Sequence, residues 1–147
     1  MWQTTLICSG KIKSGPYSAI QDEYCKRITP TPKIYELGSK SSDSDEINRQ
    51  ILSKTDPRHP VIVLDERGQN ISSEDFANLI EQFAITRSQP FQFIIGPSDG
   101  VNDQIRGRAD KVISFGKMTW PHLLSRILLL EQIYRAQTIL SGHPYHK

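Results

Sequence analysis

Short runs of apolar and β-branched residues recur along the chain, and each run ends at glycine or at charged residues. Runs of this kind are typical of β-strands. The run PVIVLDERG has the continuous apolar core of a strand that is covered on both faces in a parallel sheet. Five such runs predict five strands, over residues 4–10, 33–38, 60–68, 91–100 and 111–116, the fourth continuing into a glycine-bounded turn.

Between these runs, apolar positions fall at helical spacing and predict helices over residues 17–28, 39–54, 72–86 and 122–142. The prolines of segment 29–32 end the first helix, because proline has no backbone N–H and clashes with the preceding turn. The second and third helices open with residue pairs at capping-box spacing, Asp43 with Glu46 and Ser72 with Asp75. A polar stretch after residue 100 is compatible with a further short helix. Since strands and helices alternate, the pattern predicts an α/β layer fold with a largely parallel sheet.

The last predicted helix is apolar on more than one face. Its apolar side chains include Leu124, Ile127, Leu128, Leu130, Ile133, Tyr134, Ile139 and Leu140. One sheet cannot cover so wide an apolar surface, so the helix has to be buried on a second side. In a chain this small the second side is another subunit, and we expect a homodimer formed largely through this helix.

Length and composition place the chain among ordinary globular proteins. Its 147 residues are 37% hydrophobic and 23% charged, which predicts one domain that folds without a disulfide or a metal. The first residues lack the pattern of a secretory leader, and no run approaches the ~18 apolar residues of a membrane span. We therefore expect a cytoplasmic protein, with Cys8 and Cys25 as unreactive thiols.

Charge is distributed unevenly along the chain. Residues 1–100 hold 11 Lys and Arg against 13 Asp and Glu, and residues 101–147 hold 7 against 3, so the two parts carry −2 and +4. A basic C-terminal third suits a phosphate-rich partner, but an excess of this size is more common as a solvated face. Charge alone leaves both interpretations open.

Three loops that follow predicted strands contain glycine, at residues 64–68, 96–100 and 116–122. Ligands of open parallel sheets bind outside the carboxyl ends of the strands, so a site is expected at these loops. They hold neither a dinucleotide-binding nor a phosphate-loop motif, and the chain has no G-x-S-x-G elbow and no zinc-ligand spacing. The segment GPSDG on its own is more typical of a tight turn than of a site.

Three segments together carry a resemblance to a known family: VIVLDERG, FIIGPSDG and WPHLLSRILLLEQIYRAQTILSGHPYHK. With these segments the chain resembles the RlmH family of SPOUT-class methyltransferases over essentially its whole length. The resemblance implies that residues 1–147 form a single SPOUT methyltransferase domain whose C-terminal segment is threaded as a trefoil knot. It also implies a homodimer, the cofactor S-adenosylmethionine, and methylation of N3 of a pseudouridine in 23S ribosomal RNA, in the large subunit or the 70S ribosome.

The same resemblance assigns cofactor-binding residues. It implies that the cofactor is bound by Leu64, Gly96, Phe115, Gly116, Lys117, Met118, Thr119 and Trp120. The family usually has two adjacent glycines where this chain has Gly96 and Pro97. Because proline has no N–H, any backbone donation to the cofactor at position 97 is lost.

An imide-like nitrogen that accepts a methyl group must first lose its proton, which requires a general base or an environment that stabilises the deprotonated form. The candidates are Asp99, His122 and the tail residues His143, Tyr145 and His146. An aromatic ring between two imidazoles suits stacking and hydrogen bonding to an unstacked base, so we favour nucleotide recognition over proton removal for the tail. The basic residues expected to face RNA phosphates are Arg126, Arg135, Lys147, Arg106 and Arg108.

Two other functions compete with this interpretation: a non-catalytic SPOUT-fold module that binds RNA or the ribosome, and a methyltransferase that acts on another RNA. Calorimetry with S-adenosylmethionine separates the first from an enzyme, because a module that has lost the cofactor site gives no heat of binding. The sequence leaves open the role of the Ser/Asp-rich segment 39–46 and any requirement for an assembled ribosome.

Overall fold

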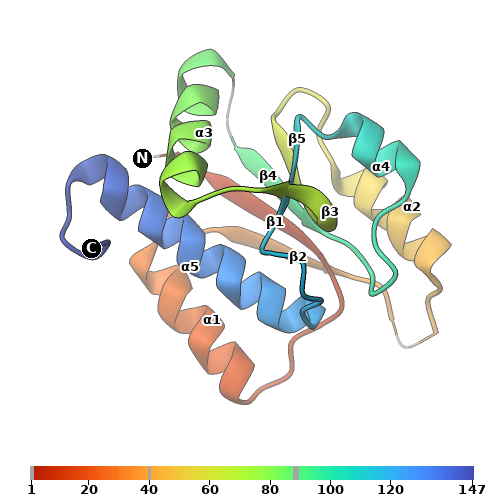
Figure 1. Ribbon diagram of the computed structural model, residues 1–147. Coiled ribbons are helices and arrows are strands. Elements are labelled where there is room, and N and C mark those ends of the chain that lie inside the picture. The colour runs from red at the N-terminus through yellow and green to blue at the C-terminus, as the bar shows by residue number, and fades with distance from the viewer. Residues whose placement is uncertain (1, 40, 88–89) are drawn as a thin grey trace.

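The computed structural model describes residues 2–39, 41–87 and 90–147, in which a five-stranded parallel sheet lies between two layers of helices (Figure 1). The strands are β1 (Thr4–Ser9), β2 (Lys33–Leu37), β3 (Val61–Asn70), β4 (Phe91–Ile95) and β5 (Lys111–Ser114). The helices are α1 (Pro16–Arg27), α2 (Ser44–Lys54), α3 (Ser73–Thr86), α4 (Asp103–Arg108) and α5 (His122–Ser141). The strand order is β2-β1-β4-β3-β5, and every neighbouring pair is parallel.

The two faces of the sheet are covered by different helices. Successive strand residues point to opposite faces, so Leu6 and Ile7 of β1 enter two separate cores. Helices α1, α3 and α5 cover the first core, which includes Phe93 and Leu130. Helices α2 and α4 cover the second, which includes Ile51. Burial on both faces explains why the strands read as continuous apolar runs.

The elements expected from the sequence are present, and the α/β fold with a parallel sheet is confirmed. The polar stretch after residue 100 contains α4, and the fourth strand ends at Ile95, before the turn. Ser72 forms a reciprocal capping box with Asp75, whose N–H donates to the Ser72 hydroxyl at 3.0 Å. Asp43 caps α2 by accepting from the N–H of Glu46 at 2.8 Å.

Strands β3 and β5 approach each other closely. Strand β5 pairs with residues 62–64 and again with residues 69–70 of β3, and the register shifts between the two stretches. A Cβ added at Gly68 would lie 2.6 Å from the carbonyl carbon of Ile113, so only glycine allows this approach. Since β4, β3 and β5 are adjacent and parallel, the loops that follow them meet at one edge of the sheet. The trefoil knot implied by the resemblance stays a prediction.

Helix α5 connects that edge of the sheet to the far side of the molecule. Its 20 residues span about 30 Å at 1.5 Å per residue. The helix ends at Gly142, whose φ of 75° is the left-handed conformation of a helix C-cap. Within the described residues, α5 and the other helices all fall short of the length and hydrophobicity needed to cross a membrane.

Candidate active site

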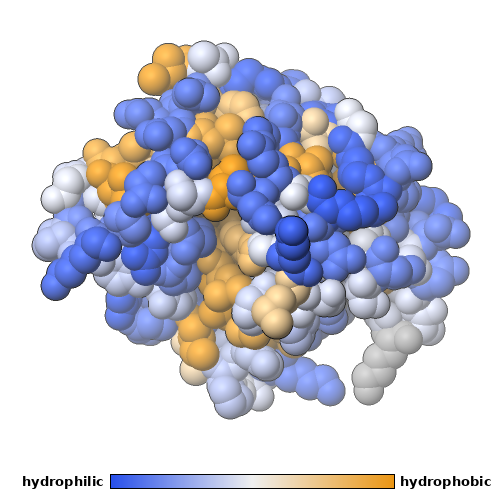
Figure 2. Space-filling view, viewed as in Figure 1, coloured by the Kyte–Doolittle hydropathy of each residue, from blue (hydrophilic) through white to orange (hydrophobic). Residues whose placement is uncertain are grey.

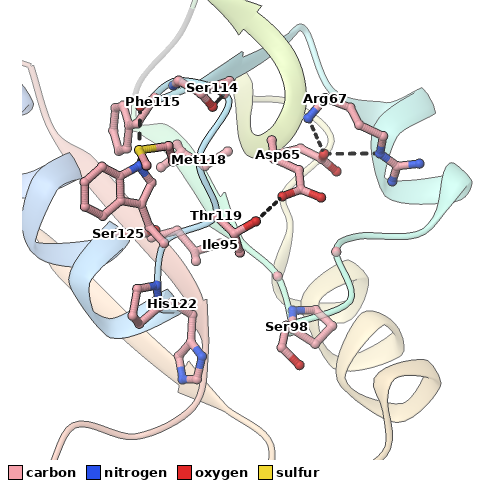
Figure 3. A pocket seen from close by; sticks show the side chains of 18 of the residues that line it. Asp65, Arg67, Ile95, Ser98, Ser114, Phe115, Met118, Thr119, His122 and Ser125 are labelled. Atoms are coloured by element: carbon pink, nitrogen blue, oxygen red, sulfur yellow. Dashed lines mark hydrogen bonds and ion pairs between the residues drawn. The ribbon is translucent and has the colours of Figure 1, made fainter.

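A pocket of about 710 Å³ lies at the carboxyl ends of β3, β4 and β5 (Figure 3). Its walls come from the three glycine-containing loops that the sequence singled out. Its volume falls within the ~300–1,000 Å³ typical of small-molecule sites. Seven of the eight predicted cofactor residues line it: Leu64, Gly96, Phe115, Gly116, Met118, Thr119 and Trp120. Lys117, the eighth, is exposed and is not among the lining residues.

Hydrogen bonds within the loop after β5 fix its conformation. The Ser114 hydroxyl donates to the Gly116 carbonyl oxygen at 2.6 Å and accepts from the Gly116 N–H at 3.2 Å. Gly116 has a φ of 111°, a conformation that L side chains rarely adopt. The Thr119 hydroxyl donates to Glu66 Oε2 at 3.0 Å, which ties this loop to the part of β3 where the register shifts. The pocket therefore has two walls that are fixed to each other.

The turn after β4 forms the wall opposite the β5 loop. A Cβ at Gly96 would lie 2.5 Å from Val101 Cγ1, so the turn is packed too tightly for any other residue. The Gly100 N–H donates to the Pro97 carbonyl oxygen at 2.8 Å and closes the turn. Asp99 accepts a hydrogen bond from the hydroxyl of Ser44, the first residue of α2. The Ser/Asp-rich segment thus contacts the candidate site through Ser44. The effect of Pro97 on cofactor binding stays a prediction.

Asp65 lines the pocket, and the sequence analysis missed it. Its side chain is 3% exposed and accepts from the Arg67 N–H at 2.9 Å and from Arg106 Nη1 at 3.2 Å. Burial alone would raise the pKa of Asp65, but the hydrogen bonds from Arg67 and the charge of Arg106 hold it below its ordinary value. The wall therefore carries an ionised carboxylate. The sequence signal for it was a charged residue directly after the apolar residues of PVIVLDERG.

His122 lies at the edge of the pocket, at the first residue of α5. A Cβ at Gly10 would lie 2.7 Å from His122 Nε2, so glycine at that position makes room for the ring. Burial and the positive charge of Arg126 lower the pKa of His122. The imidazole is therefore neutral at physiological pH and keeps a lone pair that can accept a proton.

The prediction that Arg126 faces RNA is wrong. Its side chain is 1% exposed, and its Nη1 donates to Glu36 Oε2 at 2.6 Å and to Gln21 Oε1 at 3.2 Å. Its Nη2 donates to the Gly10 carbonyl oxygen at 3.1 Å. A guanidinium enclosed by α1, β2 and the loop after β1 cannot reach a phosphate. The adjacent Cys8 is buried, which raises the pKa of its thiol to about 12 and confirms the expected lack of reactivity there.

The tail residue Tyr145 is folded back on its own helix. Its hydroxyl donates to Glu131 Oε1 at 3.1 Å, and its ring meets Tyr134 edge to face at 4.7 Å between centroids. Burial and hydrogen bonds with Tyr24 and Glu131 raise the pKa of Tyr145 to about 12. Arg135 lies over the Tyr145 ring at 4.8 Å and pairs with Glu131 at 2.6 Å. Tyr145 is therefore held in place and stays protonated at neutral pH.

The tail histidines are also held by hydrogen bonds. His146 Nδ1 lies 3.0 Å from Arg135 Nη1, and its Nε2 lies 2.7 Å from Glu74 Oε1. Since a guanidinium only donates, Nδ1 is the acceptor and the ring proton sits on Nε2. His143 Nδ1 accepts from the Tyr145 N–H at 3.2 Å, so its proton also sits on Nε2. In this arrangement both ring nitrogens of His146 are engaged, and a ligand could bind its Nε2–H only by displacing Glu74.

The tail lies at the opposite end of α5 from the pocket. The pocket includes His122 at the start of the helix, whereas His143 follows its C-cap, about 30 Å away by the helical rise. The tail therefore cannot cover the pocket of its own chain. The candidate residues that the sequence placed together form two separate groups in the structure.

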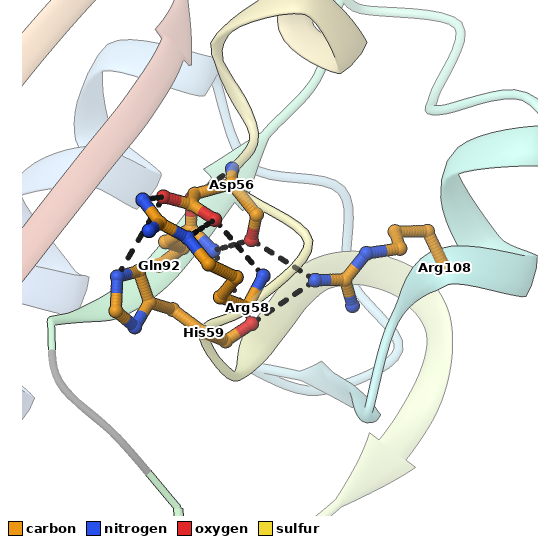
Figure 4. Close-up of polar contacts among 5 residues, drawn as sticks. All are labelled: Asp56, Arg58, His59, Gln92 and Arg108. Atoms are coloured by element: carbon orange, nitrogen blue, oxygen red, sulfur yellow. Dashed lines mark hydrogen bonds and ion pairs between the residues drawn. The ribbon is translucent and has the colours of Figure 1, made fainter.

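The predicted basic surface is divided as well. Arg106 pairs with Asp65 and with Asp103, on the face of the sheet opposite α5. Arg108 donates to the carbonyl oxygens of Asp56 at 3.0 Å and His59 at 3.1 Å, in a polar cluster near the amino ends of the strands (Figure 4). Within one chain these two arginines do not extend the surface of the tail.

Arg135 and Lys147 are the basic candidates at the tail itself. The guanidinium of Arg135 is engaged by Glu131 and His146, whereas Lys147 is exposed at the end of the chain. Their contact with RNA stays a prediction.

Comparisons with known proteins agree on one family. Residues 2–146 match the family described as predicted SPOUT methyltransferase. The chain is 41% identical over 143 residues to ribosomal RNA large subunit methyltransferase H of Paramagnetospirillum magneticum, covering 94% of both chains. It is 39% identical over 156 residues to the protein of that name from Clostridium botulinum (strain Langeland), covering 97% of this chain and 98% of the other.

Solved structures show the same fold at low sequence identity. A probable methylase family protein from Haemophilus influenzae superimposes with a TM-score of 0.64 at 10% identity, covering 97% of this chain and 67% of the other. Ribosomal RNA small subunit methyltransferase E from Neisseria gonorrhoeae, bound to S-adenosyl methionine, superimposes with a TM-score of 0.52 at 13% identity, covering 94% and 66%.

Proposed function

The chain belongs to the SPOUT methyltransferase family, and from this premise we propose that it methylates N3 of a pseudouridine in 23S ribosomal RNA with S-adenosylmethionine as donor. The observation that carries the proposal is the pocket at the carboxyl edge of the sheet, lined by seven of the eight residues that the family resemblance assigns to the cofactor. Relatives 39–41% identical over nearly their whole length are named large subunit methyltransferases. The proposed place of action is the cytoplasm, where the ribosomal substrate is.

The pocket fits a nucleoside-type cofactor. Glycine backbone at positions 96, 100 and 116 lets a ligand approach the main chain, and Met118 and Trp120 give apolar walls. Asp65 adds the negative charge of an ionised carboxylate to the wall. When bound, S-adenosylmethionine supplies an electrophilic methyl group on a sulfonium. The task of the protein is to hold the acceptor nitrogen in line with it.

A second copy of the chain would bring a tail to each pocket. Figure 2 shows an apolar band over α5 and α1, on the side of these helices that faces away from the sheet. Tyr17 and Ile20 of α1 are each 42% exposed, which is unusual for large apolar side chains. A tail about 30 Å from its own pocket becomes useful if it lies over the pocket of a partner. We therefore propose a homodimer with shared active sites.

The hydrogen bonds of the tail support a role in holding the nucleotide. Tyr145 stays protonated, and His143 and His146 carry their protons on Nε2. The Tyr145 hydroxyl already donates to Glu131, and His146 Nε2–H to Glu74. The donor that we assign to a carbonyl oxygen beside N3 is therefore His143 Nε2–H, which also stabilises the negative charge that forms when N3 loses its proton. The proton acceptor that we assign is His122, because its imidazole is neutral and lines the pocket. Asp99, in the turn after β4, is the alternative acceptor that lines the same pocket.

Methyl transfer can be tested directly. The protein is incubated with methyl-labelled S-adenosylmethionine and one of three substrates: 70S ribosomes, large subunits or free 23S RNA. The label is then located by nuclease mapping. We expect one labelled pseudouridine, and the Gly116→Val protein serves as a control with a distorted cofactor loop. Label on another RNA would change the assigned substrate. No heat of S-adenosylmethionine binding in calorimetry, together with unlabelled RNA, would instead favour a non-catalytic binding module.

A further inference from the structure

Glu74 contacts the tail from outside α5, at His146, as Tyr24 of α1 does at Tyr145. Glu74 lies in the first turn of α3, 72 positions before His146 in the sequence, and its Oε1 is 2.7 Å from His146 Nε2. The side chain of Glu74 is 61% exposed and that of His146 is 24% exposed. The hydrogen bond from His146 lowers the pKa of Glu74. Because the pair lies at the surface, it contributes little to the stability of the fold. Its role is therefore to be sought in what it does to the tail.

The backbone that carries Glu74 is fixed to α5. Ser72 and Asp75 form the capping box on either side of it. The hydroxyl of Ser73 donates to Gln132 Oε1 of α5 at 2.7 Å. The first turn of α3 is therefore anchored next to the segment of α5 that holds Glu131 and Arg135. A carboxylate at this position has a defined direction toward the tail.

Two partners from two helices fix the His146 ring. Arg135 of α5 donates to Nδ1 at 3.0 Å, and Nε2–H donates to Glu74 of α3 at 2.7 Å. Hydrogen bonds at both nitrogens set the plane of the ring and select one tautomer. Without Glu74, only Arg135 would hold the ring, and the chain beyond Tyr145 would lose its contact with α3.

We propose that Glu74 is a positioning residue for methyl transfer. It holds His146, and with it Tyr145 and Lys147, in the geometry in which the tail completes the pocket of a second copy. This inference rests on the proposed function, because it assigns a role within that active site. It adds α3 to the elements that build the site, although α3 contributes no residue to the pocket.

The test compares three variants of Glu74 and a control on the same helix. In Glu74→Ala we expect kcat to fall about ten-fold, as for a lost hydrogen bond to a charged group, with the Kd of S-adenosylmethionine unchanged. Glu74→Gln keeps an oxygen that accepts from Nε2–H, so its kcat should stay within about three-fold of wild type. Glu74→Lys places a cation beside the ring and should be at least as slow as Glu74→Ala. Glu81→Ala, an exposed glutamate of the same helix, should be unaffected.

A second readout does not depend on activity. The ring ¹⁵N shifts of His146 should report the Nε2–H tautomer in the wild type and a mixture of tautomers in Glu74→Ala. Wild-type kcat in Glu74→Ala, or a Glu74→Gln protein as slow as Glu74→Ala, would overturn the positioning role. If no variant and no wild-type protein methylates RNA, the proposed function fails, and the ¹⁵N shifts still show whether Glu74 holds the ring.

Discussion

The two ends of helix α5 differ in what they contribute. The N-terminal end borders a pocket whose walls are glycine backbone, apolar side chains and one ionised carboxylate. The C-terminal end carries a network of polar side chains, in which Glu131 contacts both Arg135 and Tyr145. His146 joins this network through Arg135 and also contacts Glu74 of α3. One end has room for a ligand, and the other has the donors that would recognise a base. About 30 Å of helix separates them.

This separation supports the proposal that the active site combines the two ends of α5 from two copies of the chain. A pocket without the tail can hold a cofactor but lacks donors for the acceptor base. The tail carries polar side chains but lies too far from the pocket of its own chain to act on a ligand there. The apolar surface left on α5 and α1 supplies a physical reason for two copies to associate and so to bring opposite ends together.

The largest expected effect tests this exchange between subunits. The tail-less variant lacks residues 143–147, and the Gly116→Val variant has a distorted cofactor loop. A Cβ at Gly116 meets no atom within 4 Å, but its φ of 111° strains a β-branched residue, so the loop changes without a clash in the core. We expect each variant alone to lose about 100-fold or more in methylation rate, as for loss of substrate positioning.

Mixing the two variants distinguishes shared sites from sites within one chain. After subunit exchange, half of the dimers combine one chain of each kind, and each of these has one intact site if the tail serves the partner. Activity should then recover to about a quarter of wild type. If the tail serves its own chain, no site is intact and the mixture stays inactive. Calorimetry should show cofactor binding by the tail-less variant and not by Gly116→Val.

The next effect compares the two arginines of α5. Arg126 is buried in an ion pair with Glu36 at the pocket end, whereas Arg135 pairs with Glu131 at the tail end. Arg126→Met leaves Glu36 without its partner and should lower the free energy of unfolding by about 3–5 kcal/mol. Arg135→Met should lower it by less than about 1 kcal/mol but reduce kcat strongly. Urea denaturation and methylation rates measure the two effects.

A double variant sharpens the interpretation of the buried pair. Replacing both Arg126 and Glu36 by methionine removes the uncompensated charge, and part of the lost stability should return. Recovery is incomplete because Glu36 also accepts from the N–H of Ile12 at 2.7 Å. An Arg126→Met protein as stable as wild type would contradict a structural role for this arginine.

The pocket was predictable from the sequence because its signals are local. Apolar runs mark the strands, and the glycines that follow them mark the loops, so residues 64–68, 96–100 and 116–122 could be named without a structure. The surplus of apolar residues on the last helix predicted a second buried side, supplied by another subunit. The structure covers much of that side within the chain, because α1 and α3 pack on α5 and Ile127, Leu130 and Ile133 are buried. Residues 96–100 and 116–122 follow their strands as expected, whereas residues 64–68 lie within β3.

The polar pairs could not be predicted, because their partners are distant in sequence. Arg126 and Glu36 are 90 positions apart, and His146 and Glu74 are 72 apart. No spacing rule links such residues before the order of strands and helices is known. Arg126 was therefore predicted to face RNA, and Glu74 was not singled out at all. The distance between the tail and the pocket also follows only from the packing of α5, which is about 30 Å long.

The smallest expected effect concerns His122, the titratable group of α5 at the pocket end. Its pKa is lowered from 6.5 in the folded protein by burial and by Arg126, so the unfolded chain binds the proton more readily. Stability is therefore complete above the unfolded pKa and is lost as pH falls below about 6.5. The carboxylates with lowered pKa, such as Asp65, titrate further down and do not produce the change expected from His122. In His122→Asn the free energy of unfolding should decline less steeply as the pH falls below about 6.5, as urea denaturation at each pH would show.

If His122 also accepts the N3 proton, the variant should lose the acidic limb of the kcat profile, whereas a base in the tail would leave that limb in place.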